Sequence, residues 1–441
     1  MSATADLTDV GQQVVALARE LGAEEAAVGV TASVYADLAQ RDGQLEKCQE
    51  SRSLSVGLEL MVDGRFSTHS TNDLRPDALR AFLSRAIDAT RFLEPDENRR
   101  LADRADMGCA DDALDVDDHT WADTAPSDRR NQVAALETAC LEAGADDPVR
   151  SINAFGYDGR VDSCMVTSNG FSKRWQRTTI GYGGQVTLED KGGRLPEAYA
   201  FYTGRHRADL PPLSSVAAEL IERGRRRMGS GPATSGRYPM LLENRAVGRL
   251  MSVLTGPLSG TAIYEGRSCL RDRLDTAIAA TNFNLLDDPL IPRALGSRPH
   301  TGDGFPSVRR HIVQDGELRS FFVDLYNSRR LKCAPTGGAS NLVIPAGQRS
   351  CEEIIASQPR LIRVDGFLGG NTNAISGDFS FGVSGTLFEN GEPVAAVSEM
   401  NISGDLFSLL DCFQEAASDT WKWGAWRSPS LLFDGIQFSG T

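Results

Sequence analysis

The sequence predicts an α+β protein of two domains, with helices and antiparallel strands in the N-terminal domain and a β-rich C-terminal domain. At about 150 residues per domain, a chain of 441 residues exceeds the length of one packed unit. Helical and strand-like patterns occur in separate blocks, which is typical of this class. Seven Asp-Gly and two Asn-Gly dipeptides mark tight turns, and these favour antiparallel hairpins over parallel crossovers.

The first elements follow from the spacing of apolar residues. Apolar side chains recur at helical spacing over residues 7–21, and Gly22 is expected to end this first helix. Residues 54–62 alternate between apolar and polar, which predicts a half-buried strand that turns at Asp63-Gly64. A second helix is expected behind Pro76, because the first turn of a helix does not need an N–H from that residue.

An acidic segment without periodicity follows at about residues 101–128, and we interpret it as a solvated connection. Three of its carboxylates, Asp115, Asp117 and Asp118, could suggest a calcium loop. The glycine and the glutamate that an EF-hand loop requires are absent from this segment, so the calcium interpretation is not favoured.

The pattern then returns to regular elements. A third helix is predicted to end at Gly144. Strands are predicted over residues 152–186, with turns at Asp158-Gly159 and Asn169-Gly170. A fourth helix is centred on residues 216–221.

The breaker run MGSGPATSG after the fourth helix predicts a domain boundary. We therefore place the two domains at residues 1–231 and 236–441. The second domain is expected to be mostly β-structure, and one clear late helix is predicted after Gly404. Its expected turns lie at Asp303-Gly304, Asp315-Gly316, Asp365-Gly366, Asn390-Gly391 and Asp434-Gly435.

The composition disfavours several classes of function. Lys and Arg number 46 against 60 Asp and Glu, and the net charge of -14 disfavours a broad face for nucleic acid. The eight cysteines show no CxxC or framework spacing, and neither a secretory signal nor an 18-residue apolar stretch occurs. We expect free thiols, no membrane contact and a cytoplasmic protein. One basic cluster is explained by the dipole at a helix end and by solvation: Arg223, Arg225, Arg226 and Arg227.

Common catalytic motifs are missing from the sequence. It contains no phosphate loop, no dinucleotide-binding GxGxxG after a strand and no GxSxG elbow. The five histidines lie too far apart for a helical pair to hold zinc. A long-range metal site built from His300, His311 and Cys333 stays open as an alternative.

Six segments resemble the TldD/PmbA family, whose members are also called modulators of DNA gyrase. The segments occur in order and span nearly the full chain, so the resemblance is specific. They are SVGLELMVDGRFSTHSTNDL (55–74), VTSNGFSK (166–173), GRYPMLLENRAVGRLMSVLTGPLSG (236–260), DGFPSVRRHIVQDGEL (303–318), GDFSFGVSGTLFENGEPV (377–394) and SPSLLFDGIQFSG (428–440).

The resemblance implies a heterodimeric zinc metallopeptidase in which one of two family branches holds the metal. In that TldD-like branch a helix carries HExxxH, and a late cysteine completes the zinc site. In this chain Asn244 falls on the first histidine of the motif, Arg245 on the glutamate and Arg249 on the second histidine. The region that matches the late cysteine, TWKWGAWRSPSLLF, contains no cysteine.

The chemistry of these replacements does not suit zinc. A guanidinium group has no lone pair to offer a metal, stays protonated, and cannot act as a general base. Two arginines in that place would also repel a dication. The departure from HExxxH therefore places the chain in the PmbA-like (TldE-like) branch. We expect no metal and no other cofactor in this chain, and zinc in the partner subunit.

Two sets of residues are candidates for peptide binding. Arg245 and Arg249 could pair with nearby carboxylates in a relict site, or one of them could face a peptide carboxylate. Glycines allow close backbone approach, so a second candidate is a strand edge that accepts an extended peptide; the alternative is a tight turn. This second segment comprises Gly377, Asp378, Phe379 and Ser380.

Three of the five tryptophans lie close together near the C-terminus. Trp421, Trp423 and Trp426 could anchor an interface with the metal-bearing subunit, or they could plug the β-rich core. The sequence leaves both interpretations open.

The resemblance as a whole predicts the non-catalytic subunit of a TldD/TldE-type zinc metallopeptidase that processes or degrades peptides. Its predicted partners are an HExxxH-bearing TldD-like subunit and a peptide, and enzymatic activity of this chain alone is not expected. Two alternatives stay open. One is a homodimeric peptide-binding or regulatory protein without peptidase activity, and the other is an independent hydrolase with unconventional metal ligands.

Overall fold

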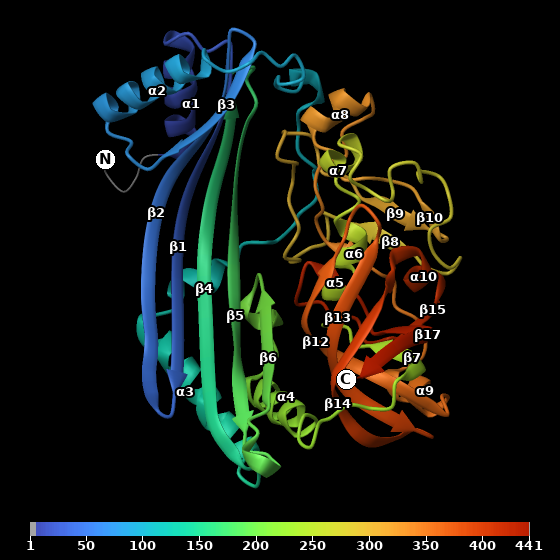
Figure 1. The fold of residues 1–441 in the computed structure, drawn as a ribbon. Coiled ribbons are helices and arrows are strands. Elements are labelled where there is room, and N and C mark those ends of the chain that lie inside the picture. Colours follow the sequence, from blue (N-terminus) through green and yellow to red (C-terminus); the bar gives the residue numbers. More distant parts are fainter. Residues whose placement is uncertain (1–5, 441) are drawn as a thin grey trace.

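The computed structural model describes residues 6–440 and contains two domains that lie side by side (Figure 1). The predicted α+β class is confirmed. The N-terminal domain is built on one antiparallel sheet of order β3-β2-β1-β4-β5-β6. Its elements are α1 (Leu7–Glu20), β1 (Glu25–Arg41), β2 (Gln44–Val62), β3 (Arg65–Thr71), α2 (Pro76–Thr90), α3 (Pro126–Ala143), β4 (Val149–Thr167), β5 (Ser172–Leu188), β6 (Glu197–Gly204) and α4 (Leu213–Arg225).

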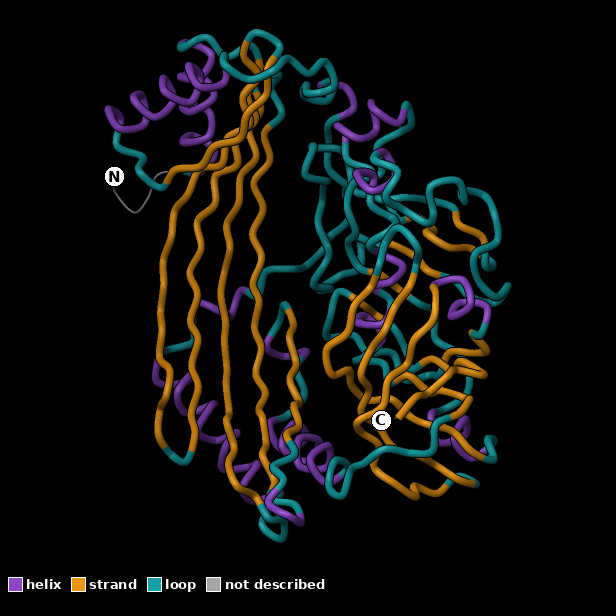
Figure 2. Tube along the Cα trace, viewed as in Figure 1, coloured by secondary structure: helices purple, strands orange, loops and turns teal. Residues whose placement is uncertain are grey.

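Helices cover the long sheet at both of its ends (Figure 2). At one end α1 and α2 pack against buried strand residues such as Val28 and Leu60. At the other end α3 and α4 pack against residues such as Ile152 and Leu188. The predicted helices and the turn at Asp63-Gly64 are confirmed. The strand predicted from residue 54 in fact starts at Gln44, because its exposed first half is polar on both faces and gives no alternation.

One predicted turn of this domain is wrong, because Asp158-Gly159 lies in the middle of β4. The Asp158 carboxylate is buried and accepts hydrogen bonds from Arg129 and from the Trp121 indole. A Cβ atom at Gly159 would lie 2.8 Å from the carbonyl oxygen of Val34 on β1, so close strand approach accounts for the glycine. The Asn169-Gly170 turn is confirmed between β4 and β5.

The acidic segment of residues 101–128 is more tightly held than a solvated connection. It contains two 3-10 turns, Arg104–Asp106 and His119–Asp123, and its last residues begin α3. Its backbone bonds to both domains, through Val116 to β5 and through Leu114 to Arg293. Two of its carboxylates form ion pairs with arginines outside the segment: Asp117 binds Arg160, and Asp115 binds Arg293. Backbone hydrogen bonds and these two ion pairs thus anchor the segment to both domains, while most of its other carboxylates stay exposed.

The C-terminal domain is β-rich, and the predicted boundary at residues 231–236 falls between α4 and β7. One sheet has the order β14-β13-β12-β7-β17-β15 and closes into a barrel through an additional β14–β17 pairing. A second sheet has the order β10-β9-β8-β11-β16. The elements are β7 (Gly236–Leu242), α5 (Val247–Leu250), α6 (Ser252–Thr255), α7 (Gly260–Tyr264), β8 (Leu285–Asp287), β9 (Arg310–Gln314), β10 (Glu317–Leu318), α8 (Leu325–Leu331), β11 (Leu342–Val343), α9 (Cys351–Ala356), β12 (Arg360–Thr372), β13 (Asp378–Glu389), β14 (Glu392–Asp405), α10 (Leu406–Asp411), β15 (Phe413–Ala416), β16 (Trp426–Arg427) and β17 (Leu431–Gly440).

The turn dipeptides of this domain have two structural roles. Asp315-Gly316 and Asn390-Gly391 form hairpin turns, and Asp303-Gly304 lies in a loop turn, as predicted. Asp365-Gly366 and Asp434-Gly435 lie inside β12 and β17, where the strand register shifts. These two predicted turns are wrong, because an Asp-Gly pair also suits the bulge that bends a barrel strand.

The late helix predicted after Gly404 is confirmed as α10, which Asp405 caps through its side chain. The other helices of the domain, α5 to α9, have four to seven residues and were not predicted from the sequence. Across residues 6–440, no helix combines the length and the apolar character needed to cross a membrane.

Candidate functional site

The positions that match the HExxxH motif follow the end of β7, where the domains meet. Asn244 and Arg245 lie in a turn, and only Arg249 lies on the four-residue helix α5. The six positions therefore do not share one continuous helix. The three side chains have different partners.

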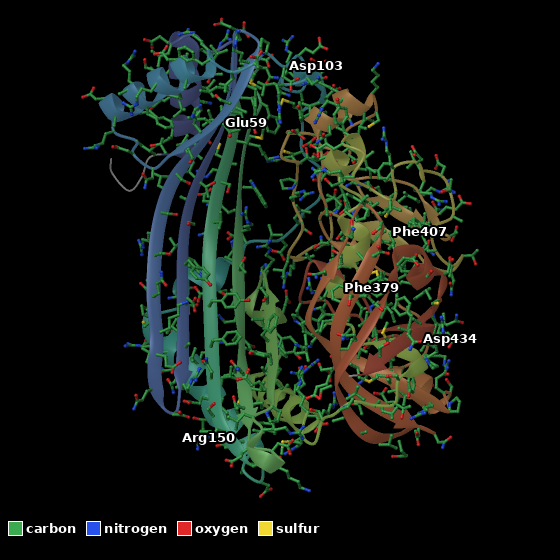
Figure 3. All side chains as sticks on the ribbon, viewed as in Figure 1. Glu59, Asp103, Arg150, Phe379, Phe407 and Asp434 are labelled. Atoms are coloured by element: carbon green, nitrogen blue, oxygen red, sulfur yellow. The ribbon has the colours of Figure 1, made fainter. Side chains whose placement is uncertain are left out.

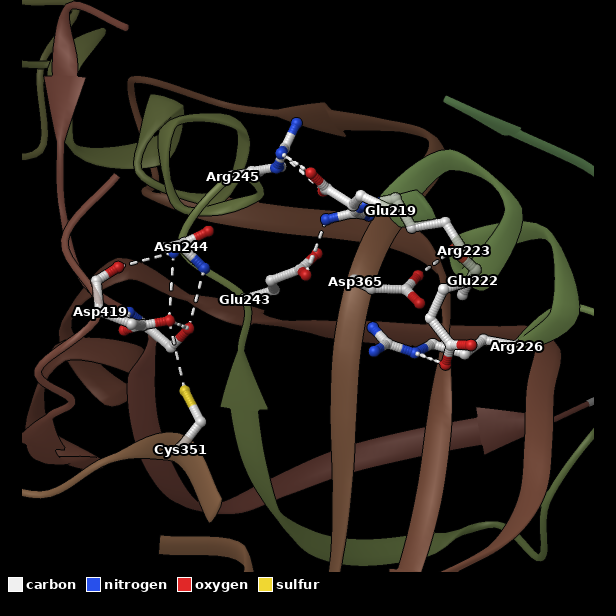
Figure 4. Close-up of polar contacts among 12 residues, drawn as sticks. Glu219, Glu222, Arg223, Arg226, Glu243, Asn244, Arg245, Cys351, Asp365 and Asp419 are labelled. Atoms are coloured by element: carbon white, nitrogen blue, oxygen red, sulfur yellow. Dashed lines mark hydrogen bonds and ion pairs between the residues drawn. The ribbon is translucent and has the colours of Figure 1, made fainter. Parts of the chain in front are cut away.

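Asn244 belongs to a small polar cluster around Asp419 (Figure 4). Its amide nitrogen donates to the Asp419 backbone oxygen at 2.7 Å and to Oδ2 at 3.1 Å. The Ser430 hydroxyl donates to the same Oδ2 at 2.7 Å, and the Cys351 thiol lies 3.3 Å from it. Asp419 thus ties the turn after β7 to the segments that precede β17 and begin α9.

Arg245 takes part in a chain of ion pairs that joins the two domains (Figure 4). Its Nη2 lies 2.6 Å from Oε1 of Glu219 on α4. Arg223, one turn further along α4, donates to Glu219 at 2.9 Å and to Glu243 at 2.7 Å. Two arginines and two glutamates therefore alternate across the junction, which compensates the burial of the arginines.

Two neighbouring aromatic rings pack against the Arg245 guanidinium. Its central carbon lies 3.8 Å from the centre of the Trp421 ring and 4.7 Å from that of Tyr202. The Tyr202 hydroxyl donates to Glu219, so one glutamate binds both the arginine and its aromatic neighbour. This arrangement fixes the guanidinium plane through stacking and hydrogen bonds.

Glu219 is predicted to make stability depend on pH. Burial raises its pKa, but Arg245, the Tyr202 hydroxyl and Arg223 outweigh burial and hold the pKa below its ordinary value of 4.5. The ionised carboxylate therefore adds stability above about pH 4.5, and this stability is lost as the pH falls through the lower folded-state pKa. Between about pH 6 and pH 3, we expect the wild type to lose more free energy of unfolding than Glu219→Gln in urea titrations. Equal losses would contradict this role.

Arg249 differs from Arg245 in its surroundings. Its side chain is exposed, donates to the Gly370 carbonyl oxygen at 3.2 Å and lies over the Phe381 ring at 5.1 Å. Among residues 6–440, no carboxylate forms an ion pair with it. Of the two arginines considered for a peptide carboxylate, Arg245 is engaged by Glu219, whereas Arg249 is open to solvent.

The segment from Gly377 to Ser380 leads into β13, and its interpretation as a free strand edge is wrong. Phe379 and Ser380 pair with β12 on one side and with β14 on the other. The Phe379 side chain, labelled in Figure 3, is only 5% exposed and belongs to the barrel core. Strand addition needs unpaired backbone, so an extended peptide cannot add here. Contact between Asp378 and a peptide stays a prediction.

The three late tryptophans pack within the chain. Trp421 and Trp423 contact Tyr202 and the apolar cluster beneath α3 and α4, so they reach into the N-terminal domain. Trp426 lies over Gly248, where an added Cβ atom would come within 2.8 Å of the indole. All three side chains are half-buried. A further contact with another subunit stays a prediction.

The motif residues do not suit a zinc ion. The Asn244 amide nitrogen is used as a donor, and neither Arg245 nor Arg249 carries a lone pair. Burial raises the pKa of the nearby Cys351 thiol to about 12, so this sulfur is protonated at neutral pH. The side chains at these positions thus provide hydrogen bonds and positive charge rather than metal ligands.

The alternative metal site is also not formed in the described part of the chain. Within residues 6–440, no group of three or more His, Cys, Asp or Glu side chains is arranged to hold a metal ion. The His300 ring instead makes edge contacts with the Phe171 and Trp175 rings. The alternative of a metal site built from His300, His311 and Cys333 therefore finds no support in residues 6–440.

Sequence reasoning missed the residues that hold the motif positions. Glu219, Tyr202 and Asp419 lie 25 or more positions away from them in the sequence, and no local pattern links them. The spacing of Glu219 and Arg223 on α4 is visible in the sequence, but it indicates only a pair within one helix.

Comparison with known proteins gives matches along most of the chain. A family model described as the PmbA/TldA metallopeptidase C-terminal domain matches residues 235–440, and one described as PmbA/TldA metallopeptidase domain 1 matches residues 26–90. The chain is 26% identical over 402 residues to Metalloprotease PmbA of Escherichia coli O157:H7, covering 90% of this chain and 88% of that protein. It is 24% identical over 436 residues to a Metalloprotease PmbA homolog of Haemophilus influenzae, covering 97% and 94%.

Solved structures extend the likeness to the whole fold. A protein from Bacteroides thetaiotaomicron, named a candidate modulator of DNA gyrase, is 31% identical with a TM-score of 0.95, and the match covers 100% of both chains. TldE from Thermococcus kodakarensis shares the fold with a TM-score of 0.87 at 17% identity, covering 98% of this chain and 100% of that one. The protein described here belongs to the PmbA/TldD/TldE family of metallopeptidase-like proteins.

Proposed function

We propose that this protein is the non-catalytic subunit of a heterodimeric zinc metallopeptidase that processes or degrades peptides. A TldD-like partner with HExxxH would supply the zinc ion and the general base. The metallopeptidase class comes from the family to which the chain belongs. The assignment to a non-catalytic role depends on one observation: Arg245 stands at the motif's glutamate position and is held there by Glu219, Trp421 and Tyr202.

The charge at the motif supports this role. A general base must accept a proton from water, and a guanidinium held in an ion pair cannot do so. In this proposal the site has become a structural joint between the two domains. Its partners come from α4, from the turn after β7 and from the segment before β17.

Arg249 is the proposed contribution of this chain to peptide binding. Its guanidinium is exposed and donates one hydrogen bond within the described residues, to the Gly370 carbonyl oxygen. A planar guanidinium with free N–H groups can bind a carboxylate through two parallel hydrogen bonds. A peptide with a free C-terminus or an acidic side chain provides such a group.

The proposal is tested by measuring peptide cleavage with purified subunits. An unstructured peptide is incubated with this protein alone, with an HExxxH-bearing homologue alone, and with the mixture. Cleavage is expected only in the mixture, which should also elute as one complex from a sizing column. Zinc analysis should then assign the metal to the homologue.

Three outcomes would contradict the proposal. Stoichiometric zinc and peptide cleavage by this protein alone would identify an independent hydrolase. A stable homodimer that ignores the homologue would favour a peptide-binding or regulatory protein. Full activity of the homologue in isolation would remove the need for this subunit.

A further inference from the structure

A second polar site lies on the outer surface of the barrel, beside the ion pairs of the domain junction but lined by other side chains (Figure 4). A pocket of about 320 Å³ opens between α4 of the N-terminal domain and α9 of the C-terminal domain. Strands β12 and β13 form its floor. Its charged and polar lining residues are Glu222, Arg226, Glu352, Arg363 and Thr386, and Ile355 and Phe388 add apolar surface.

Two neighbouring residues of the floor carry polar groups without partners. Arg363 on β12 and Thr386 on β13 are directly opposite each other in the sheet register. Thr386 is 7% exposed, and its hydroxyl makes no hydrogen bond within the described residues. The buried Nε of Arg363 likewise has no partner, and no ion pair joins this guanidinium to any residue of 6–440. Unmade hydrogen bonds of this kind are costly in a folded protein.

The charged residues around Arg363 are engaged elsewhere. Arg226 pairs with Glu222 at 3.1 Å, and Glu243 pairs with Arg223 at 2.7 Å. Asp365 accepts the Ser384 hydroxyl at 3.1 Å. Burial and the nearby positive charge of Arg226 lower the pKa of Arg363, while Glu243 and Asp365 oppose this. The guanidinium is thus a partly buried cation that the surrounding side chains do not neutralise by direct contact.

We infer that this pocket binds a small organic carboxylate. Its carboxylate group would accept hydrogen bonds from the Arg363 guanidinium and the Thr386 hydroxyl, and its apolar part would lie against Ile355 and Phe388. The apolar walls favour an organic acid over inorganic phosphate, although both offer oxygen acceptors. Because α4 and the barrel both line the pocket, the ligand bridges the two domains. This inference is independent of the proposed peptidase role.

Substitution of Glu352 distinguishes an anion-binding site from a structural ion pair. It lies on the rim of the pocket, is exposed and forms no ion pair with Arg363. If the pocket serves an anion, Glu352 competes with that anion and its removal improves binding. If Glu352 instead pairs with Arg363 in solution, Glu352→Gln leaves the guanidinium without a counter-charge and lowers the stability of the protein.

Benzoate is the probe, with benzamide as the neutral control and inorganic phosphate as the second anion, each measured by isothermal calorimetry on the full chain. Saturable benzoate binding is expected, with weaker phosphate binding and none for benzamide. Arg363→Met should weaken benzoate binding by about tenfold or more, and Thr386→Val by about fivefold. Glu352→Gln should strengthen it by about threefold. Phosphate binding tighter than benzoate binding would overturn the assignment to an organic acid.

Thermal unfolding separates a binding site from a structural arginine. Without ligand, Arg363→Met should melt at the same temperature as the wild type or higher, because it removes an unneutralised cation. Benzoate should raise the melting temperature of the wild type but not of Arg363→Met. Lower melting temperatures for both Arg363→Met and Glu352→Gln, or equal benzoate binding by wild type and Arg363→Met, would overturn the inference.

Discussion

Glu219→Gln is expected to lower the free energy of unfolding by about 2–3 kcal/mol. The substitution keeps the shape of the side chain but removes the negative charge that Arg245 and Arg223 share. Only Glu243 would then remain to compensate two arginines that are largely buried. Urea titration at neutral pH measures the effect.

Glu222→Gln is the matched control for this prediction. Glu222 lies on the same helix, one turn from Glu219, and pairs with Arg226, but almost half of its side chain is exposed. An exposed ion pair contributes little, so this substitution should cost less than about 1 kcal/mol. Equal costs for the two substitutions would show that the chain of ion pairs at the domain junction has no special role in stability.

A variant that recreates the HExxxH motif is expected to show no peptide cleavage. The triple variant Asn244→His, Arg245→Glu, Arg249→His spells the catalytic motif, yet the cysteine that would complete the site is missing from the late segment. A new carboxylate at position 245 would also face Glu219, which now lies 2.6 Å from the arginine. Two like charges in that place repel each other, so a loss of stability is expected as well.

The readout for the triple variant has two parts. Peptide cleavage and bound zinc are measured on the variant alone, with the mixture of wild-type protein and HExxxH homologue as the positive control. No cleavage above background and no stoichiometric zinc are expected. Cleavage by the variant alone would mean that the fold still contains a working metal site, and it would contradict the proposed division of labour.

Local signals in the sequence predicted elements that depend on local physics. The first helix, the strand that ends at Val62 and the hairpin at Asn390-Gly391 all follow from apolar periodicity, alternation or turn chemistry. The same signals failed where a distant segment changed the role of a residue. Asp158-Gly159 would make an ordinary turn, but β1 and Arg129 hold it in a strand.

The sequence predicted one part of the candidate site but not the other. The arginines at the motif positions can be read from the sequence, and the chemistry of the guanidinium group excludes them as zinc ligands. Their partners could not be predicted. Glu219 and Trp421 are separated by about two hundred positions, and only the packing of α4 against the barrel brings both to Arg245.

The sequence by itself determined the family likeness, the α+β class and the loss of the motif's metal-binding side chains, because these depend on residue identity and on spacing over a few positions. Tertiary structure alone decided that Arg245 is neutralised by α4, that β13 is paired on both sides and that Arg363 has no ion-pair partner within residues 6–440. Neutralisation and burial depend on which distant segments meet, and the free energy of a charge is set by those neighbours rather than by its place in the chain.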